Sequence, residues 1–80
     1  METYILNLQA SNGKTTYQAV EANTSSEAVN SFFGSHGKWV KMSNSEIPSG
    51  TYRSGTYSVE AGYVTVKKPN RVHDWFKLVN

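Results

Sequence analysis

The sequence contains no cysteine, so no disulfide framework can support the fold. Small domains often add disulfides or a metal ion to a thin core. A chain of 80 residues without cysteine therefore depends on apolar packing, or on a core shared with a second copy. The lack of cysteine also fits a reducing compartment, and we expect a cytoplasmic protein that is a monomer or a homodimer.

Long apolar runs are also missing, and none approaches the length needed to cross a bilayer. The first eight residues have no basic segment and no apolar core of an export signal. We therefore expect no contact with a membrane. The length fits one domain, residues 1–80, because no repeat or linker divides the chain.

The residues needed for common catalytic chemistry are few. Only His36 and His73 could act as a base for a serine nucleophile, and His73 next to Asp74 would point to the opposite face of a strand. The carboxylates are scattered, and no zinc, calcium or phosphate-binding motif is present. We therefore expect a protein that is not an enzyme, with no catalytic residue, metal or cofactor.

Among the features that are present, the first half has the clearest pattern. Residues 2–8 and 14–22 alternate as strands, and Asn12-Gly13 between them predicts a two-residue hairpin turn with positive φ at both positions. Thr24 and Glu27 form a capping box at the start of a helix that Gly34 would end. Its core stripe would be Ala28, Val29, Phe32 and Phe33, with Asn30 and Ser31 facing water.

The second half predicts further strands around a long polar connection, residues 43–58. Residues 38–42 read as a strand, and residues 57–60 and 63–67 as a hairpin that turns at Ala61-Gly62. Residues 74–79 fit a last strand or a short helical turn. The order of elements predicts an α+β fold: an antiparallel sheet built from an N-terminal β-hairpin, one short helix and three or more strands, with the helix packed on one face.

Charge is distributed unevenly between the two halves. Residues 1–36 carry one base and three acids, whereas residues 37–80 carry seven bases and three acids. This asymmetry fits a face that prefers an acidic partner, or an ordinary soluble surface. The connection is rich in Ser, Gly, Thr and Tyr, as adaptable protein-binding loops are, although a flexible linker or extra edge strands fit equally well.

These features predict a protein partner, for which a nucleoprotein complex is one option. We expect loop contacts from Tyr52, Arg53 and Tyr57, and a charged rim of Lys38, Lys41, Lys67, Lys68 and Arg71. The alternative is a nucleic-acid-binding domain in which exposed aromatics, such as Trp39, Tyr63 and Trp75, stack on bases. Those aromatics could instead cover the second face of the sheet.

Three pieces of the first half carry a resemblance: Thr3-Tyr4-Ile5-Leu6, Asn12-Gly13 and Thr24-Ser25-Ser26-Glu27-Ala28-Val29. Their layout resembles small phage and mobile-element proteins, including anti-CRISPR proteins. The resemblance implies an inhibitor that occupies a surface on a host nucleic-acid-handling defence complex, without catalysis, in the cytoplasm of a bacterial host. That group shares no common motif, so no functional residue is carried over.

Overall fold

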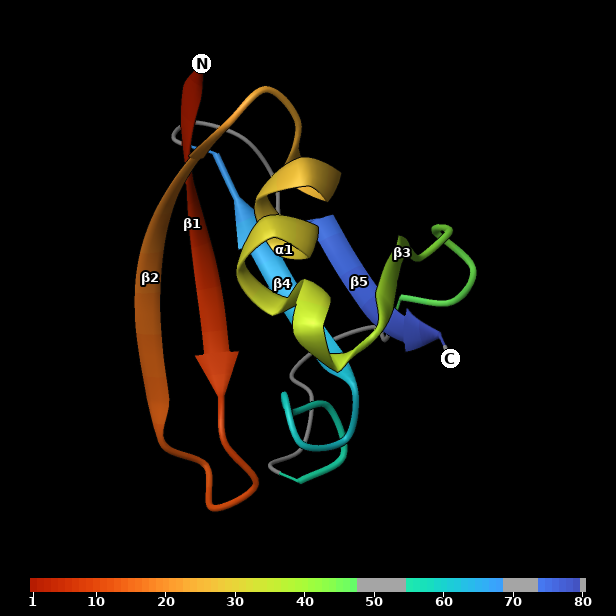
Figure 1. The fold of residues 1–80 in the computed structure, drawn as a ribbon. Helices are drawn as coiled ribbons and strands as arrows, with labels where there is room; N and C mark the ends of the chain where they lie inside the picture. The colour runs from red at the N-terminus through yellow and green to blue at the C-terminus, as the bar shows by residue number, and fades with distance from the viewer. Residues whose placement is uncertain (48–54, 69–73, 80) are drawn as a thin grey trace.

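The computed structural model describes residues 1–47, 55–68 and 74–79, in which five strands and one short helix form (Figure 1). The predicted α+β class is confirmed, and the last segment is a strand rather than a helical turn. In chain order the elements are β1 (Glu2–Gln9), β2 (Thr15–Ala22), α1 (Ser25–Phe33), the 3-10 turn η1 (Gly34–His36), β3 (Lys38–Lys41), β4 (Tyr63–Lys67) and β5 (Asp74–Val79).

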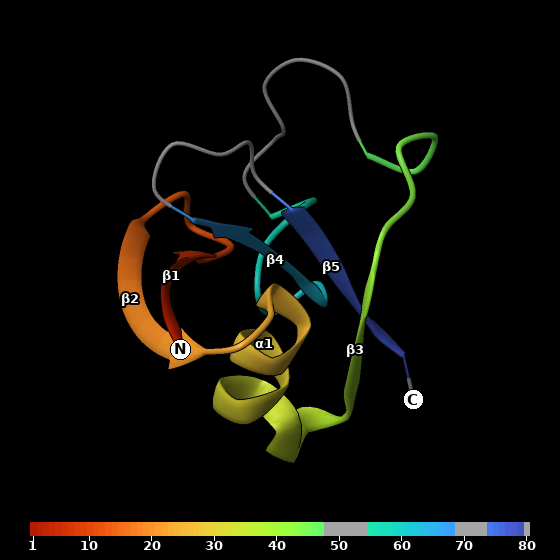
Figure 2. The same cartoon turned by 90° about the horizontal axis from the view of Figure 1, so that it is seen from above.

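The strands form a single antiparallel sheet in the order β2-β1-β4-β5-β3. Helix α1 lies across one face of this sheet, as the view from above shows (Figure 2). The β1–β2 hairpin is joined to the rest through β4, which pairs with the other side of β1. Strands β2 and β3 are therefore the two edges of the sheet.

The core lies between α1 and one face of the sheet, which we call the helix face. Leu6, Val29 and Phe76 are buried at the centre of this layer. Because side chains alternate along each strand, the neighbouring positions point to the opposite face, which we call the open face. Its residues include Ile5, Asn7, Tyr17, Thr65, Lys67, Trp75 and Lys77.

Helix α1 begins and ends where the sequence predicts, but a 3-10 turn follows it. The Thr24 hydroxyl accepts a hydrogen bond from the Glu27 amide at 3.1 Å. Gly34, however, has a right-handed φ of −60° and continues into η1, so the chain leaves its helical path at Gly37, whose φ is 140°. The α-helix therefore ends at Phe33 with Gly34 as its cap, as predicted, but the positive φ typical of a capping glycine falls three residues later, at Gly37.

The apolar stripe of α1 is narrower than expected. The buried residues of the helix are Ala28, Val29 and Phe33. Phe32, in contrast, is 43% exposed, and its ring packs edge-on with the Phe33 ring, with the two centroids 4.7 Å apart. Phe32 as a core anchor is therefore wrong, since a helix of nine residues turns that position toward the rim of the sheet.

Asn30 was expected to face water, but its side chain holds β3 against the helix. Its Oδ1 accepts the Trp39 amide at 3.0 Å, and its Nδ2 donates to the Trp39 carbonyl at 3.2 Å. Trp39 itself is buried on the helix face, and its indole nitrogen donates to the Phe33 carbonyl at 3.1 Å. Trp39 therefore joins the main core and covers no part of the open face.

The β1–β2 turn is shifted by one residue from the predicted position. The Gly13 amide donates to the Ala10 carbonyl at 2.9 Å, which places Ser11 and Asn12 at the corner. Gly13 follows with a φ of 89°, and the Ala10 amide donates to the Lys14 carbonyl at 2.8 Å. These bonds define a three-residue loop, with Ser11 and Asn12 at the corner and a left-handed glycine after them, in place of the expected two-residue Asn12-Gly13 turn.

Residues 57–60 were predicted to be a strand and instead form consecutive turns. The buried Ser58 organises them, because its carbonyl accepts the amides of Ala61 and Tyr63. The Val59 amide donates to the Gln9 carbonyl at 3.0 Å, and the Glu60 carboxylate accepts the Ser11 amide at 2.9 Å. This segment therefore closes one end of the sheet, and the expected hairpin with β4 does not form.

Candidate functional site

Five of the eight predicted contact residues lie within the described part of the chain. Lys38 and Lys41 are the ends of β3, Lys67 ends β4 and Lys68 follows it, and Tyr57 lies in the turns before β4. Tyr52, Arg53 and Arg71 lie outside the described residues.

The sheet separates the four predicted contact lysines into two pairs. Lys41 shares the helix face with Trp39, and Lys68 reaches the same end of that face. Lys38 and Lys67 alternate to the open face, where Lys67 pairs in register with Ile5. The structure therefore brings Lys41 and Lys68 together and places Lys38 and Lys67 on the opposite side.

Lys41 and Lys68 meet in a cavity of about 320 Å³ near the start of α1, which we call the polar cavity. Both lysines contact carboxylates there: Lys68 forms an ion pair with Glu2, and Lys41 Nζ lies 3.5 Å from Asp74 Oδ1. Ser25 Oγ donates to Asp74 Oδ2 at 3.1 Å. The remaining lining residues are Tyr4, Asn23, Thr24 and Val66.

The ion pair fixes the charge state of Glu2. The hydrogen bond from Lys68 holds the pKa of the Glu2 carboxyl below its ordinary value of 4.5, against the opposing effect of desolvation. The carboxylate, which is ionised at neutral pH, therefore compensates the charge of Lys68 and stays ionised to lower pH than an isolated glutamate. The polar cavity presents two compensated cations, with little net positive field for an anionic ligand.

The open face carries an aromatic cluster made of Tyr57, Tyr63 and Trp75. The Tyr57 ring meets the Tyr63 ring edge-on with centroids 5.0 Å apart, and it meets Trp75 edge-on at 5.7 Å. Trp75 is only 9% exposed in this arrangement. The rings therefore pack on one another, which stabilises the cluster and leaves less aromatic surface for stacking with a nucleic-acid base.

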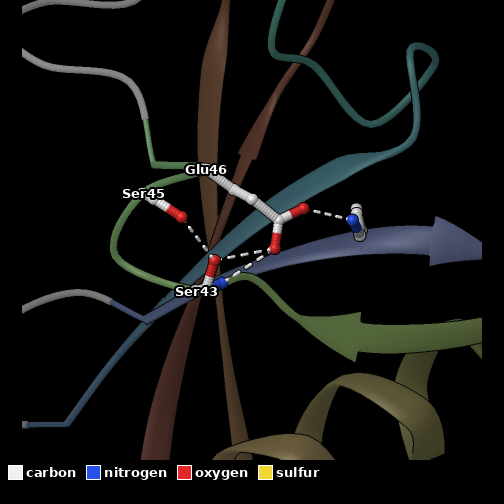
Figure 3. Close-up of polar contacts among 4 residues, drawn as sticks. Ser43, Ser45 and Glu46 are labelled. Atoms are coloured by element: carbon white, nitrogen blue, oxygen red, sulfur yellow. Dashed lines mark hydrogen bonds and ion pairs between the residues drawn. The ribbon is translucent and has the colours of Figure 1, made fainter.

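A turn next to this face is held by a serine and a glutamate (Figure 3). Glu46 Oε1 accepts both the amide and the hydroxyl of Ser43 at 3.0 Å, while its other oxygen pairs with Lys77. The Ser45 and Ser43 hydroxyls lie 3.1 Å apart. The hydrogen bond from Lys77, followed by those from Ser43, lowers the pKa of Glu46 from 4.5 to about 2.

So low a pKa makes Glu46 a poor base for the Ser43 hydroxyl at neutral pH, because it hardly binds a proton there. The contacts instead fix the path of the chain after β3. Within residues 1–47, 55–68 and 74–79, no three His, Cys, Asp or Glu side chains gather in a way that could hold a metal ion.

The Glu46 contacts predict a specific dependence of stability on pH. A carboxyl whose pKa is lowered by folding adds stability above its unfolded value of 4.5, and that contribution is lost as pH falls through about 2. We expect Glu46→Gln to lower the thermal midpoint at pH 7 and to match the parent near pH 2. Thermal unfolding followed by circular dichroism from pH 7 to pH 2 measures this.

The matched control is Lys77→Met, which removes the main cause of the lowered pKa. In that background Glu46→Gln should cost less stability at pH 7 than it does in the parent. If the thermal midpoint of Glu46→Gln stayed below that of the parent by the same amount down to pH 2, the proposed stabilisation by the ionised Glu46 would be contradicted.

Comparison with protein-family models, with curated proteins and with solved structures finds no match to this chain. The resemblance to small phage inhibitors therefore stays a prediction. None of the described helices has the length and apolar character needed to span a membrane.

The carboxylate partners of these lysines do not follow from the sequence alone. Glu2, Glu46 and Asp74 each compensate a lysine, and two of these pairs join residues 31 and 66 positions apart. Only the strand register brings such residues together. The single available signal was that the chain contains almost as many acids as bases.

Proposed function

We propose that the protein is a non-enzymatic binding protein that recognises a protein partner, and that it acts as a phage-encoded inhibitor of a nucleic-acid-handling defence complex in the bacterial cytoplasm. The observation that supports a protein partner is the compensation of its lysines. Lys41, Lys68 and Lys77 each contact a carboxylate. The surface is therefore a mosaic of both charges.

A mosaic of this kind suits a protein partner better than a nucleic acid. Binding of a polyanion is driven by uncompensated cations that replace counterions, and three of the lysines already face a carboxylate. A protein interface, in contrast, tolerates charges of both signs at its rim around an apolar or aromatic centre. Tyr57, half-buried over Tyr63 and Trp75, supplies a rigid aromatic centre on the open face.

A phage-plating assay tests this function. We expect expression of the protein to raise plating of a phage on a bacterial strain whose CRISPR defence targets it, and to have no effect on a strain without that defence. Tyr57→Ala should reduce the effect by about tenfold or more, as expected for an aromatic anchor at an interface.

Phe32→Ala is the matched control, because Phe32 is also a partly exposed aromatic residue but lies on α1, away from the open face. It should keep full activity. Circular dichroism of both variants verifies that each is folded. No rise in plating with the parent protein would reject the inhibitor, and full activity of a folded Tyr57→Ala would reject the aromatic centre.

A salt titration distinguishes the nucleic-acid alternative. Of the predicted contact lysines, Lys38 and Lys67 form no ion pair with another described residue, so both are free to contact a phosphate backbone. Fluorescence anisotropy with short single-stranded DNA and RNA should show no micromolar binding at about 50 mM salt. Binding that weakens steeply toward about 200 mM salt, and that Lys38→Gln/Lys67→Gln removes, would instead identify a nucleic-acid-binding domain.

A further inference from the structure

The two edges of the sheet are protected very differently. Strand β3 has four residues, two of them lysines, and the Asn30 side chain occupies the amide and carbonyl of Trp39. Strand β2 has eight residues without proline or lysine, all paired to β1 in continuous register. Short length, lysines and covering side chains are the usual devices that keep an edge from pairing. Within the described residues, β3 has all three, whereas β2 has only the Gln18 side chain, which donates to the Ala19 carbonyl.

The register shows which backbone groups of β2 point outward. The Val59 amide donates to the Gln9 carbonyl, so odd-numbered residues of β1 bond on the side away from β2. Even-numbered residues of β1 therefore bond to β2, through their even-numbered partners. The amides and carbonyls of Thr15, Tyr17, Ala19 and Glu21 consequently face outward. The Gln18 side chain agrees, because its amide donates to the Ala19 carbonyl at 3.0 Å.

We propose that β2 is a self-association surface that pairs antiparallel with β2 of a second copy, with the twofold axis at Gln18. This inference is separate from the proposed function. Because the outward residues of β2 are odd-numbered, each must lie opposite an odd-numbered residue of the second copy. A twofold axis at Gln18 meets this condition and pairs residues 15–21 of the two strands, seven from each copy. It places Tyr17 opposite Ala19 of the second copy, and Ala19 opposite Tyr17 of the second copy, as a twofold interface demands.

The side chains at these positions are complementary in size. Tyr17 is 68% exposed on the open face, a high value for a tyrosine on a strand. Ala19 is small, and it pairs with Ile5 of β1. Ile5 lines a depression of about 290 Å³ together with Asn7, Tyr17 and Lys67. The side chain of Tyr17 of the second copy can therefore extend over Ala19 and contact Ile5. Each copy supplies both the large residue and the space beside it.

Charge also favours a second copy in the antiparallel direction. Lys14 lies just before β2, and Glu21, near its far end, is the only charged residue within the strand. Antiparallel pairing brings the basic end of one strand to the acidic end of the other, whereas parallel pairing would place like charges side by side. The seam is narrower than the interface of a permanent dimer, so we expect a dissociation constant in the micromolar range.

Disulfide cross-linking tests the register, since the chain has no other cysteine. At the twofold axis the two Gln18 residues form a non-hydrogen-bonded pair with Cα atoms about 4.5 Å apart, within the range a disulfide accepts. Gln18→Cys should therefore form covalent dimers under mild oxidation about tenfold faster than Thr16→Cys. In this register Thr16 lies opposite Val20 of the second copy, roughly 13 Å from its own counterpart.

Analytical ultracentrifugation over a concentration series tests the association without cysteine. The parent should pass from monomer to dimer at micromolar concentrations, and Ala19→Lys should stay monomeric because it places a charge in the seam. Val40→Lys, an exposed position on the other edge, should dimerise like the parent. A parent that is monomeric throughout, or equal cross-linking rates for Gln18→Cys and Thr16→Cys, would overturn the proposal.

Discussion

Trp39→Ala is expected to lower the free energy of unfolding by about 3–5 kcal/mol. The indole is 2% exposed and lies 5.5 Å from the Phe33 ring, so its removal leaves a large cavity at the junction of α1 and β3. It also leaves the Phe33 carbonyl without its buried donor. A domain of this size has a total stability of about 4–12 kcal/mol, so the variant should be close to unfolding.

Urea denaturation followed by far-UV circular dichroism measures this loss without relying on Trp39 fluorescence. Trp39→Phe is the matched variant, because it keeps an aromatic ring but removes the indole donor, and it should lose less than Trp39→Ala. Val40→Ala, at the adjacent and partly exposed position, should change stability by less than about 1 kcal/mol. A Trp39→Ala loss equal to that of Val40→Ala would contradict the described core.

Phe76→Ala is expected to cost a similar amount, about 3–5 kcal/mol, for a different reason. Phe76 has no exposed surface and lies on β5 between Val64 of β4 and Lys41 of β3. Strand β3 pairs within the sheet only through β5, so a cavity at this position weakens the attachment of β3 as well as the core.

Native-state hydrogen exchange distinguishes these two effects. We expect the β3 amides in Phe76→Ala to lose more protection than those of the β1–β2 hairpin, which pairs independently of β5. Phe76→Leu keeps most of the apolar volume and should lose no more than about 1.5 kcal/mol. Val79→Ala, at an exposed position of the same strand, serves as the surface control. Uniform loss of protection across the sheet would show that β3 has no separate dependence on Phe76.

The two proposals place different activities on different parts of one molecule. The partner surface centres on Tyr57 over β4 and β5, whereas self-association uses β2, at the opposite edge from β3. Variants of one surface should therefore leave the other intact. A dimer would display two copies of the partner surface, and Ala19→Lys in the plating assay would show whether the second copy matters to inhibition.

The fold class, most strand positions and the start of the helix follow from the amino-acid pattern, because these features depend on neighbours along the chain. Alternating residues predicted β1, β2 and β4, and Thr24 with Glu27 predicted the cap that the structure shows. The local sequence signal was less reliable for the exact position of the β1–β2 turn. Asn12-Gly13 predicted a two-residue turn, whereas the structure has a longer turn whose Ser11 amide donates to Glu60.

The surroundings of the candidate residues, in contrast, depend on contacts between distant parts of the chain. Asn30 turns from the solvent to hold Trp39, Phe32 is displaced to the rim, and the lysines of the second half meet carboxylates. Glu2 and Lys68 are 66 positions apart, and their contact follows from the β1–β4 register. Composition measures how much charge a chain carries, but whether a charge is available to a partner depends on which strands pair, and that is a property of the whole fold.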